Sequence, residues 1–192
     1  MELKAGVKTF YAKTQKEWRN WLEKNHRSEK AVWLIFYKKG SGTQSTNYAE
    51  TLEDALCFGW IDSKANKRDD ESYYQYFAKR KPESNWSKVN KEKVAKLIEK
   101  GLMAAAGFES IDIAKRNGTW SALDEVEELI IPSDLQLLFD NNKRAFENWE
   151  NFPRSVKRGI LEWILNAKRP ETRQKRTAET VELAEKNIKV NF

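Results

Sequence analysis

The sequence predicts an α+β protein: a small, mostly antiparallel sheet with packed helices over residues 1–85, then an all-helical part over residues 86–192 that shares one core with it. Three observations predict this class. The run VWLIFY at 32–37 is apolar at consecutive positions, which is typical of a central strand. Aromatic residues point to alternate faces in SYYQYFAK at 72–79, and after Pro82 apolar residues recur with helical spacing.

The first part is expected to alternate strands with helices. In KTFYAKTQKEWRNWLEKNH (8–26) a short strand leads into a helix, because Thr14 and Glu17 have the three-residue spacing of a capping box. The strand at 32–37 ends at Gly-Ser-Gly, and NYAETLEDALCFG (47–59) has the apolar face of a second helix.

The chain then passes from a hairpin to helices. Two antiparallel strands, WIDSKANKR and SYYQYFAKR, are expected to be joined by the turn DDE. After them an acidic connector, LDEVEELIIP, separates two groups of helices. Their starts and stops follow Ser, Pro and Gly signals and predict helices from Ser87 to Gly101, from about Met103 to Asn117, from Pro132 through Phe139, around Phe146 and Trp149, from Pro153 and from Pro170.

The stretch DALCFGWIDSKANKR at 54–68 holds the only cysteine, and it is interpreted as structural. Cys57 lies between apolar neighbours, and Gly59 stands where a left-handed residue would end the helix. A reactive thiolate needs a basic partner, and the only histidine, His26, is expected at an exposed helix end. The alternative is an enzyme whose pocket is lined by Trp60 and Asp62.

Enzyme chemistry has no specific motif in this sequence. One cysteine and one histidine exclude an internal disulfide and the usual zinc sites, so no metal, cofactor or catalytic residue is predicted. No Gly-rich phosphate loop or nucleophile elbow is present. No apolar run approaches the roughly 20 residues of a membrane span, and the first residues do not resemble a secretory signal, which predicts a cytoplasmic protein.

The net charge of +6 is unevenly distributed along the chain. Residues 1–100 carry 21 basic and 14 acidic residues, whereas residues 101–192 carry 14 and 15. Within the second half, residues 120–150 hold eight acids and two bases, and residues 154–176 hold eight bases and two acids. Blocks of this kind favour an anionic partner at the basic faces, or else form ordinary solvated surface.

The first candidate anion site lies at the helix start in AKRKPESNWSKVNKEK (78–93). Cations, small polar side chains and a tryptophan gather there beside unpaired backbone N–H groups, a combination suited to phosphate or carboxylate. The candidate ligand-binding residues are Lys79, Arg80, Lys81, Ser84, Asn85, Trp86 and Ser87. The alternative is plain helix capping by Ser87, with the lysines in water.

The second candidate anion site is the helix start in AKRPETRQKR (167–176). Arg169, Arg173 and Arg176 are spaced four and three residues apart and therefore share one helix face. An anion held between this cluster and the first is the leading hypothesis. Internal pairing of these arginines with the acidic 120–150 segment is the equal alternative.

Two further partners are carried as alternatives. The aromatic YYQYF beside AKRK resembles the stacking-plus-cation surface that binds single-stranded nucleic acid, although such alternation is also typical of a sheet packed on helices. A protein partner could bind the C-terminal helices, for which an exposed Trp149 or Trp163 would be the sign.

Several segments together resemble the YdeI/OmpD-associated family, often labelled bacteriocin-protection proteins. They are EDALCFGWIDS (53–63), FAKRKPESNWSKVNKEKVAKLIEKGLMAAAG (77–107) and ILNAKRPETRQKR (164–176), with VWLIFYKKGSG (32–42) in support. One departure is IDSKANKR, where the family pattern has a glycine after the aspartate.

The resemblance implies a small soluble bacterial protein with an α/β front part, grouped with YjbR- and frataxin-like folds, and a helical C-terminal segment. The family labels point to protection against peptide toxins or envelope stress, and they carry no reaction and no agreed catalytic residues. The sequence and the resemblance together therefore predict a non-enzymatic binding protein that engages an anionic small molecule or nucleic acid.

Overall fold

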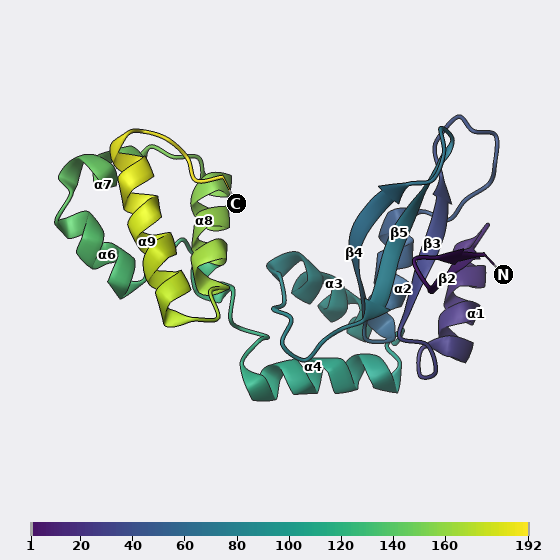
Figure 1. The fold of residues 1–192 in the computed structure, drawn as a ribbon. Coiled ribbons are helices and arrows are strands. Elements are labelled where there is room, and N and C mark those ends of the chain that lie inside the picture. Colours follow the sequence, from purple (N-terminus) through teal and green to yellow (C-terminus); the bar gives the residue numbers. More distant parts are fainter. Residues whose placement is uncertain (1, 192) are drawn as a thin grey trace. The chain divides into compact units, whose positions relative to one another are not determined.

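The computed structural model describes residues 2–191, and its contacts divide the chain into two compact units, with the boundary in the sequence between Ser121 and Ala122 (Figure 1). The elements of the first unit are β1 (Leu3–Lys4), β2 (Val7–Tyr11), α1 (Gln15–Asn25), β3 (Ala31–Tyr37), α2 (Tyr48–Cys57), β4 (Trp60–Lys67), β5 (Ser72–Lys79), α3 (Lys88–Glu99) and α4 (Ala105–Asn117). The second unit contains α5 (Asp124–Glu127), α6 (Ser133–Asp140), α7 (Lys143–Glu150), α8 (Arg154–Leu165) and α9 (Pro170–Glu185).

The sheet has the strand order β1-β2-β3-β5-β4. β2 pairs with β3 in parallel, because α1 returns the chain to the same end of the sheet, and the other three pairings are antiparallel. β4 and β5 form the predicted hairpin, and its register shifts between Asp62 and Ala65. The predicted α+β class is confirmed, with a mixed sheet in the first unit and helices throughout 124–185.

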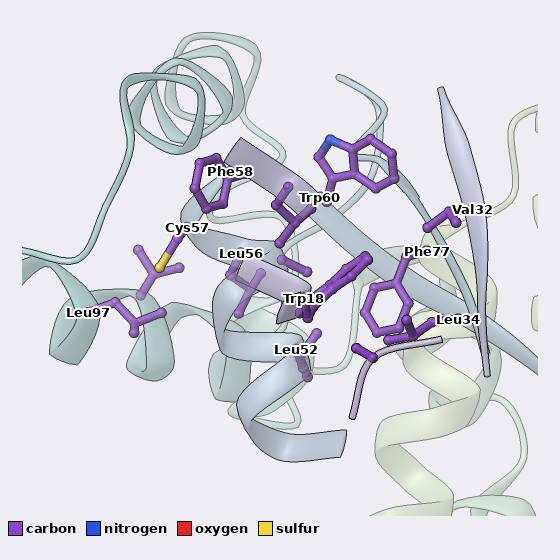
Figure 2. Packing of buried hydrophobic residues seen from close by; sticks show 14 of the residues in the cluster. Trp18, Val32, Leu34, Leu52, Leu56, Cys57, Phe58, Trp60, Phe77 and Leu97 are labelled. Carbon is purple, nitrogen blue, oxygen red and sulfur yellow. The ribbon is translucent and has the colours of Figure 1, made fainter. Parts of the chain in front are cut away.

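One face of the sheet packs against α1 and α2. Trp18 of α1 is fully buried between the sheet and Trp21, and its indole N–H donates to the Thr51 carbonyl oxygen of α2 at 3.0 Å. Figure 2 shows Trp18 next to Phe77 of β5, with Trp60 of β4 in the same core. The alternation expected for β5 is confirmed, since Phe77 points into this core and Tyr74 and Tyr76 lie in a separate cluster.

α3 and α4 belong to the first unit, so the boundary between the units follows residue 121 and not residue 85. The physical reason is apolar burial: Val94 and Leu97 of α3 and Ile111 of α4 belong to the same buried cluster as the sheet and α2. Gly59 has φ +71° and follows the last turn of α2, as predicted for a left-handed helix stop.

The second unit is built around α9, which packs against α6, α7 and α8. Its core includes Leu135 and Phe139 of α6, Trp149 of α7 and Ile160 and Ile164 of α8. Trp149 is only 1% exposed, so it is a core residue and does not offer the exposed surface expected of a partner-binding anchor. In the part of the chain that the structure covers, no helix has the length and apolar character needed to cross a membrane.

Candidate anion-binding pocket in the first unit

A pocket of about 400 Å³ lies in the first unit, where the end of α1, the end of α2, the end of β5 and α4 come together. Phe58 and Gly59 form one part of its wall, Lys79 and Arg80 a second part, and Ser110 of α4 a third. It thus brings two of the predicted ligand residues into a cavity with groups from three other segments.

Arg80 is the unusual residue of this pocket. Its Nε and Nη1 atoms are enclosed, and within residues 2–191 neither has a hydrogen-bond partner. Nη2 donates to the Asn85 carbonyl oxygen, and the guanidinium carbon lies 4.0 Å from the centroid of the Trp86 ring. Burial lowers the pKa of Arg80 to about 10, so the group still carries its charge at neutral pH.

The local fold fixes the position of Arg80 from both sides. Its backbone N–H donates to the Gly59 carbonyl oxygen at 2.9 Å, which extends the β4–β5 pairing by one residue. Trp86, on which the guanidinium stacks, is 1% exposed. Its backbone N–H donates to the Thr119 carbonyl oxygen at 3.1 Å, and its ring centroid lies 5.0 Å from that of Trp120. The cation therefore sits on a rigid aromatic support.

The other charges of the pocket are mostly positive. Lys79 donates through Nζ to the Arg27 carbonyl oxygen at 2.6 Å. Arg27 and Glu109 approach each other only at 4.0 Å, with both side chains largely exposed. Three cations and one carboxylate therefore line the pocket, and a negatively charged guest is electrostatically favoured.

The pocket also has an aromatic wall. His26 lies against Phe58 with a ring-centroid distance of 5.0 Å, and Trp60 backs the wall, fully buried, with its indole N–H donating to the His26 carbonyl oxygen at 3.3 Å. The His26 Nδ1 atom is 2.8 Å from the Leu22 carbonyl oxygen, which places a proton on Nδ1. An anion with an apolar or aromatic body matches such a site.

The remaining residues of the first predicted cluster have mainly structural positions. Ser87 is the N-cap of α3 and accepts from the Asn90 N–H at 3.3 Å. Ser84 donates its backbone N–H to the Lys81 carbonyl in a turn, and Lys81 is exposed. The capping alternative thus describes Ser87, while Arg80 and Lys79 keep the features of a binding site.

The second predicted cluster forms contacts within the second unit. Arg173 binds Asp134 of α6 through two hydrogen bonds of 2.6 and 2.9 Å. Arg176 donates to the Trp163 carbonyl and lies 4.8 Å over that ring, whereas Arg169 is exposed at the N-cap of α9. Residues 79–87 belong to the first unit and residues 169–176 to the second, and an anion shared by the two clusters stays a prediction.

Trp60 and Asp62, the two residues of the alternative pocket, do not line the same pocket. Trp60 backs the pocket just described, but Asp62 is held elsewhere: its Oδ2 accepts from the Tyr48 hydroxyl at 2.7 Å and from the Gln75 amide at 3.1 Å. Burial, aided by the bond to Asp62, raises the pKa of Tyr48. Asp62 thus pairs with Tyr48 and Gln75 and is not among the residues that line the pocket beside Arg80.

Cys57 is completely buried at the end of α2 and belongs to the core shown in Figure 2. Burial raises the pKa of its thiol, and the nearby Arg19 opposes that shift only in part. Among the described residues, no group of three His, Cys, Asp or Glu side chains is arranged to hold a metal ion.

Comparison with protein families identifies both units. Residues 10–110 match the family described as "Domain of unknown function (DUF8412)", and residues 128–187 match "Bacteriocin-protection, YdeI or OmpD-Associated". The first match covers more than half of the chain, so the chain belongs to that family of domains. The match of residues 128–187 confirms the resemblance to the bacteriocin-protection, YdeI or OmpD-associated family for the second unit, which contains the segment 164–176, whereas the segments at 32–42, 53–63 and 77–107 lie in the first match. No curated protein and no solved structure matches the chain.

Proposed function

We propose that this protein is a non-enzymatic binding protein that takes up a small anion with an apolar body in the pocket beside Arg80. The observation that carries the proposal is the Arg80 guanidinium, which is charged and has two enclosed nitrogens with no acceptor in residues 2–191. A buried charge without a partner costs several kcal/mol, and an anionic guest would remove that cost.

The chemistry of the pocket favours a carboxylate or phosphate ester. The delocalised positive charge of the Arg80 guanidinium attracts the oxygens of either anion. Lys79 adds a second cation, and Phe58 offers an apolar surface for the rest of the molecule. Ser110 and His26 both line the pocket, but no hydrogen bond joins them in the described chain, which supports binding rather than catalysis by an activated serine.

Isothermal titration calorimetry at low salt tests this proposal with four probes: phenyl phosphate, benzoate, inorganic phosphate and neutral benzyl alcohol. We expect the two aromatic anions to bind, inorganic phosphate to bind more weakly, and benzyl alcohol not to bind. Arg80→Met should weaken phenyl phosphate or benzoate binding by about 10- to 100-fold, the range of a charged hydrogen bond.

Lys81→Ala is the matched control, because it removes a neighbouring exposed cation that does not line the pocket. Its affinity should stay within about twofold of wild type. Equal binding by wild type and the folded Arg80→Met variant, or no binding of either aromatic anion, would reject the pocket as an anion site.

The family description of the second unit supplies the biological setting of the proposal. We propose that the protein contributes to bacteriocin protection or stress resistance from the cytoplasm. A bacterial strain lacking the chain should be more sensitive to a bacteriocin panel, and fractionation of cells that produce it tests the compartment. Rescue by wild type but not by Arg80→Met would link protection to the pocket.

A further inference from the structure

The face of the sheet opposite α1 and α2 is a second aromatic surface. Trp33 of β3 and Tyr74 and Tyr76 of β5 lie together there, with ring-centroid distances from Trp33 of 6.1 Å and 4.8 Å respectively. The residues of this cluster all come from β2, β3 and β5, so strands alone build it.

Cations, and not an apolar layer, lie over these rings. Lys4 Nζ is 4.3 Å from the Tyr74 centroid and 5.4 Å from that of Trp33. Lys64 Nζ approaches Trp33 at 5.7 Å and Tyr76 at 5.9 Å. Cation–π contacts of this kind are worth only about 0.5–1 kcal/mol at exposed sites, so a stronger partner can displace the ammonium groups.

The charge on this face is only partly neutralised by the protein. The guanidinium carbon of Arg68 lies 5.9 Å from the centroid of the Tyr74 ring. The same guanidinium forms ion pairs with Glu2 at 3.7 Å and with Asp69 at 3.4 Å. Lys4 and Lys64 form no ion pair with any residue of the described chain. The surface therefore has two uncompensated lysines on top of aromatic rings.

Trp33 provides an independent sign of a missing partner. The residue is only 2% exposed, yet its indole N–H has no acceptor within residues 2–191. Buried Trp N–H groups usually find an acceptor. A base carbonyl or a phosphate oxygen is an acceptor that the cations above the ring would also attract.

We propose that this sheet face binds single-stranded nucleic acid, independently of the pocket beside Arg80. Unpaired bases stack first on Tyr76, the partly exposed ring of the three, and on Trp33 and Tyr74 once Lys4 and Lys64 leave these rings and move with Arg68 onto the phosphates. A duplex hides its base faces and cannot make these contacts. An acidic peptide could satisfy the lysines but would leave the stacking surface unused.

Fluorescence anisotropy with labelled dT12 and rU12 tests this proposal, with a 12-base-pair duplex and an oligoglutamate of 12 residues as competing ligands. Both single strands should bind at low salt, each more tightly than the duplex or the peptide. Three phosphate contacts predict a log–log salt slope of about −2, at roughly −0.7 per contact.

Two variants separate stacking from charge. Tyr76→Leu keeps apolar bulk and should weaken binding by about 5- to 100-fold, the range for one stacked base. Lys64→Ala should weaken binding and reduce the salt slope by about 0.7. Lys67→Ala is the matched control, because Lys67 pairs with Asp70 and lies opposite Tyr73, whose side chain joins the other face.

Several results would overturn the proposal. The first is that neither single strand binds at low salt. The second is that the duplex or oligoglutamate binds as tightly as the single strands. The third is that Lys67→Ala weakens binding as much as Lys64→Ala does. The Arg80→Met variant should bind dT12 normally, so failure of the sheet-face proposal and failure of the pocket proposal are distinguishable.

Discussion

The Cys57 carbonyl oxygen lies 2.3 Å from the position that a β-carbon would occupy on Gly107. The two backbones are held at this separation by the Ala104 N–H, which donates to the same carbonyl at 3.0 Å. α4 therefore begins in direct backbone contact with the end of α2. This contact places Ser110 and Glu109 at the pocket and explains why a glycine stands at position 107.

Gly107→Ala should destabilise the first unit. The added methyl group must push either α4 or the end of α2 away, at a cost of about 1–3 kcal/mol for overpacking. Denaturant unfolding followed by tryptophan fluorescence measures this loss, because six of the eight tryptophans precede residue 122. An unchanged unfolding midpoint would contradict the close contact.

Gly59→Ala should destabilise the first unit for two reasons, a left-handed backbone and a close contact with α4, and Gly101→Ala separates them. Gly59 has φ +71°, and a β-carbon there would lie 2.7 Å from the Ala106 carbonyl oxygen. Gly101 has a similar φ of +66° after α3 but open space around it. Gly101→Ala should cost about 1–2 kcal/mol for the left-handed backbone alone, and Gly59→Ala should cost clearly more. Equal losses would show that the contact with α4 adds no strain.

Arg80→Met should not lower, and is expected to raise, the stability of the ligand-free protein. A cation with two unpartnered nitrogens is replaced by a side chain of similar length, and such exchanges stabilise by up to a few kcal/mol even where an ion pair is lost. Thermal unfolding without added anions measures the change. A loss of more than about 1 kcal/mol would mean that stacking on Trp86 outweighs the cost of burying the charge.

Cys57 should react with a thiol reagent only when the first unit opens. The side chain is completely buried, and burial raises the pKa of the thiol, so little thiolate forms at neutral pH. The same shift makes stability fall as pH rises above the thiol's ordinary pKa, because the unfolded chain then releases its proton more readily. If the native protein at pH 7.5 is labelled as fast as the chain unfolded in guanidinium chloride, Cys57 is not protected in this way.

The fold followed from the sequence because its signals are local. Thr14 accepts a hydrogen bond from the Glu17 N–H at the start of α1, and Ser87 does the same for Asn90 at the start of α3. Gly59 was recognisable as a helix stop because glycine tolerates the positive φ that this position has in the structure. Each of these residues acts on neighbours within four positions, so spacing alone reveals it.

The pocket was only half predictable, because its groups come from distant segments. Lys79 and Arg80 were visible as cations, but nothing local shows that α4 brings Ser110 opposite them. His26, expected at an exposed helix end, instead packs on Phe58 across 32 residues of sequence. The one available signal was the glycine at 107 in a helical stretch, which often marks a close backbone approach.

The bidentate pair of Arg173 with Asp134 should act as a pH-dependent connection between α9 and α6. Arg173 lowers the pKa of Asp134, so the folded state holds this carboxylate ionised to a lower pH than the unfolded chain does. The sign of the effect follows: the pair stabilises fully above the ordinary pKa of 3.8, and its contribution disappears as pH falls through the lowered value. Both side chains are about one-third or more exposed, so we expect about 0.5–1 kcal/mol from the pair.

Carboxyl-carbon NMR titration and a double-mutant cycle measure both consequences of this pair. The Asp134 midpoint should lie below 3.8 in the wild type and return toward that value in Arg173→Ala. At pH 7 hydrogen exchange in α9 should accelerate in Arg173→Ala and in Asp134→Ala, and the double variant should lose less than the sum of the two. Arg169→Ala is the control, since this exposed arginine precedes α9, and it should leave both the midpoint and the exchange unchanged. Additive losses, or an Asp134 midpoint insensitive to Arg173, would show that the pair does not couple the two helices.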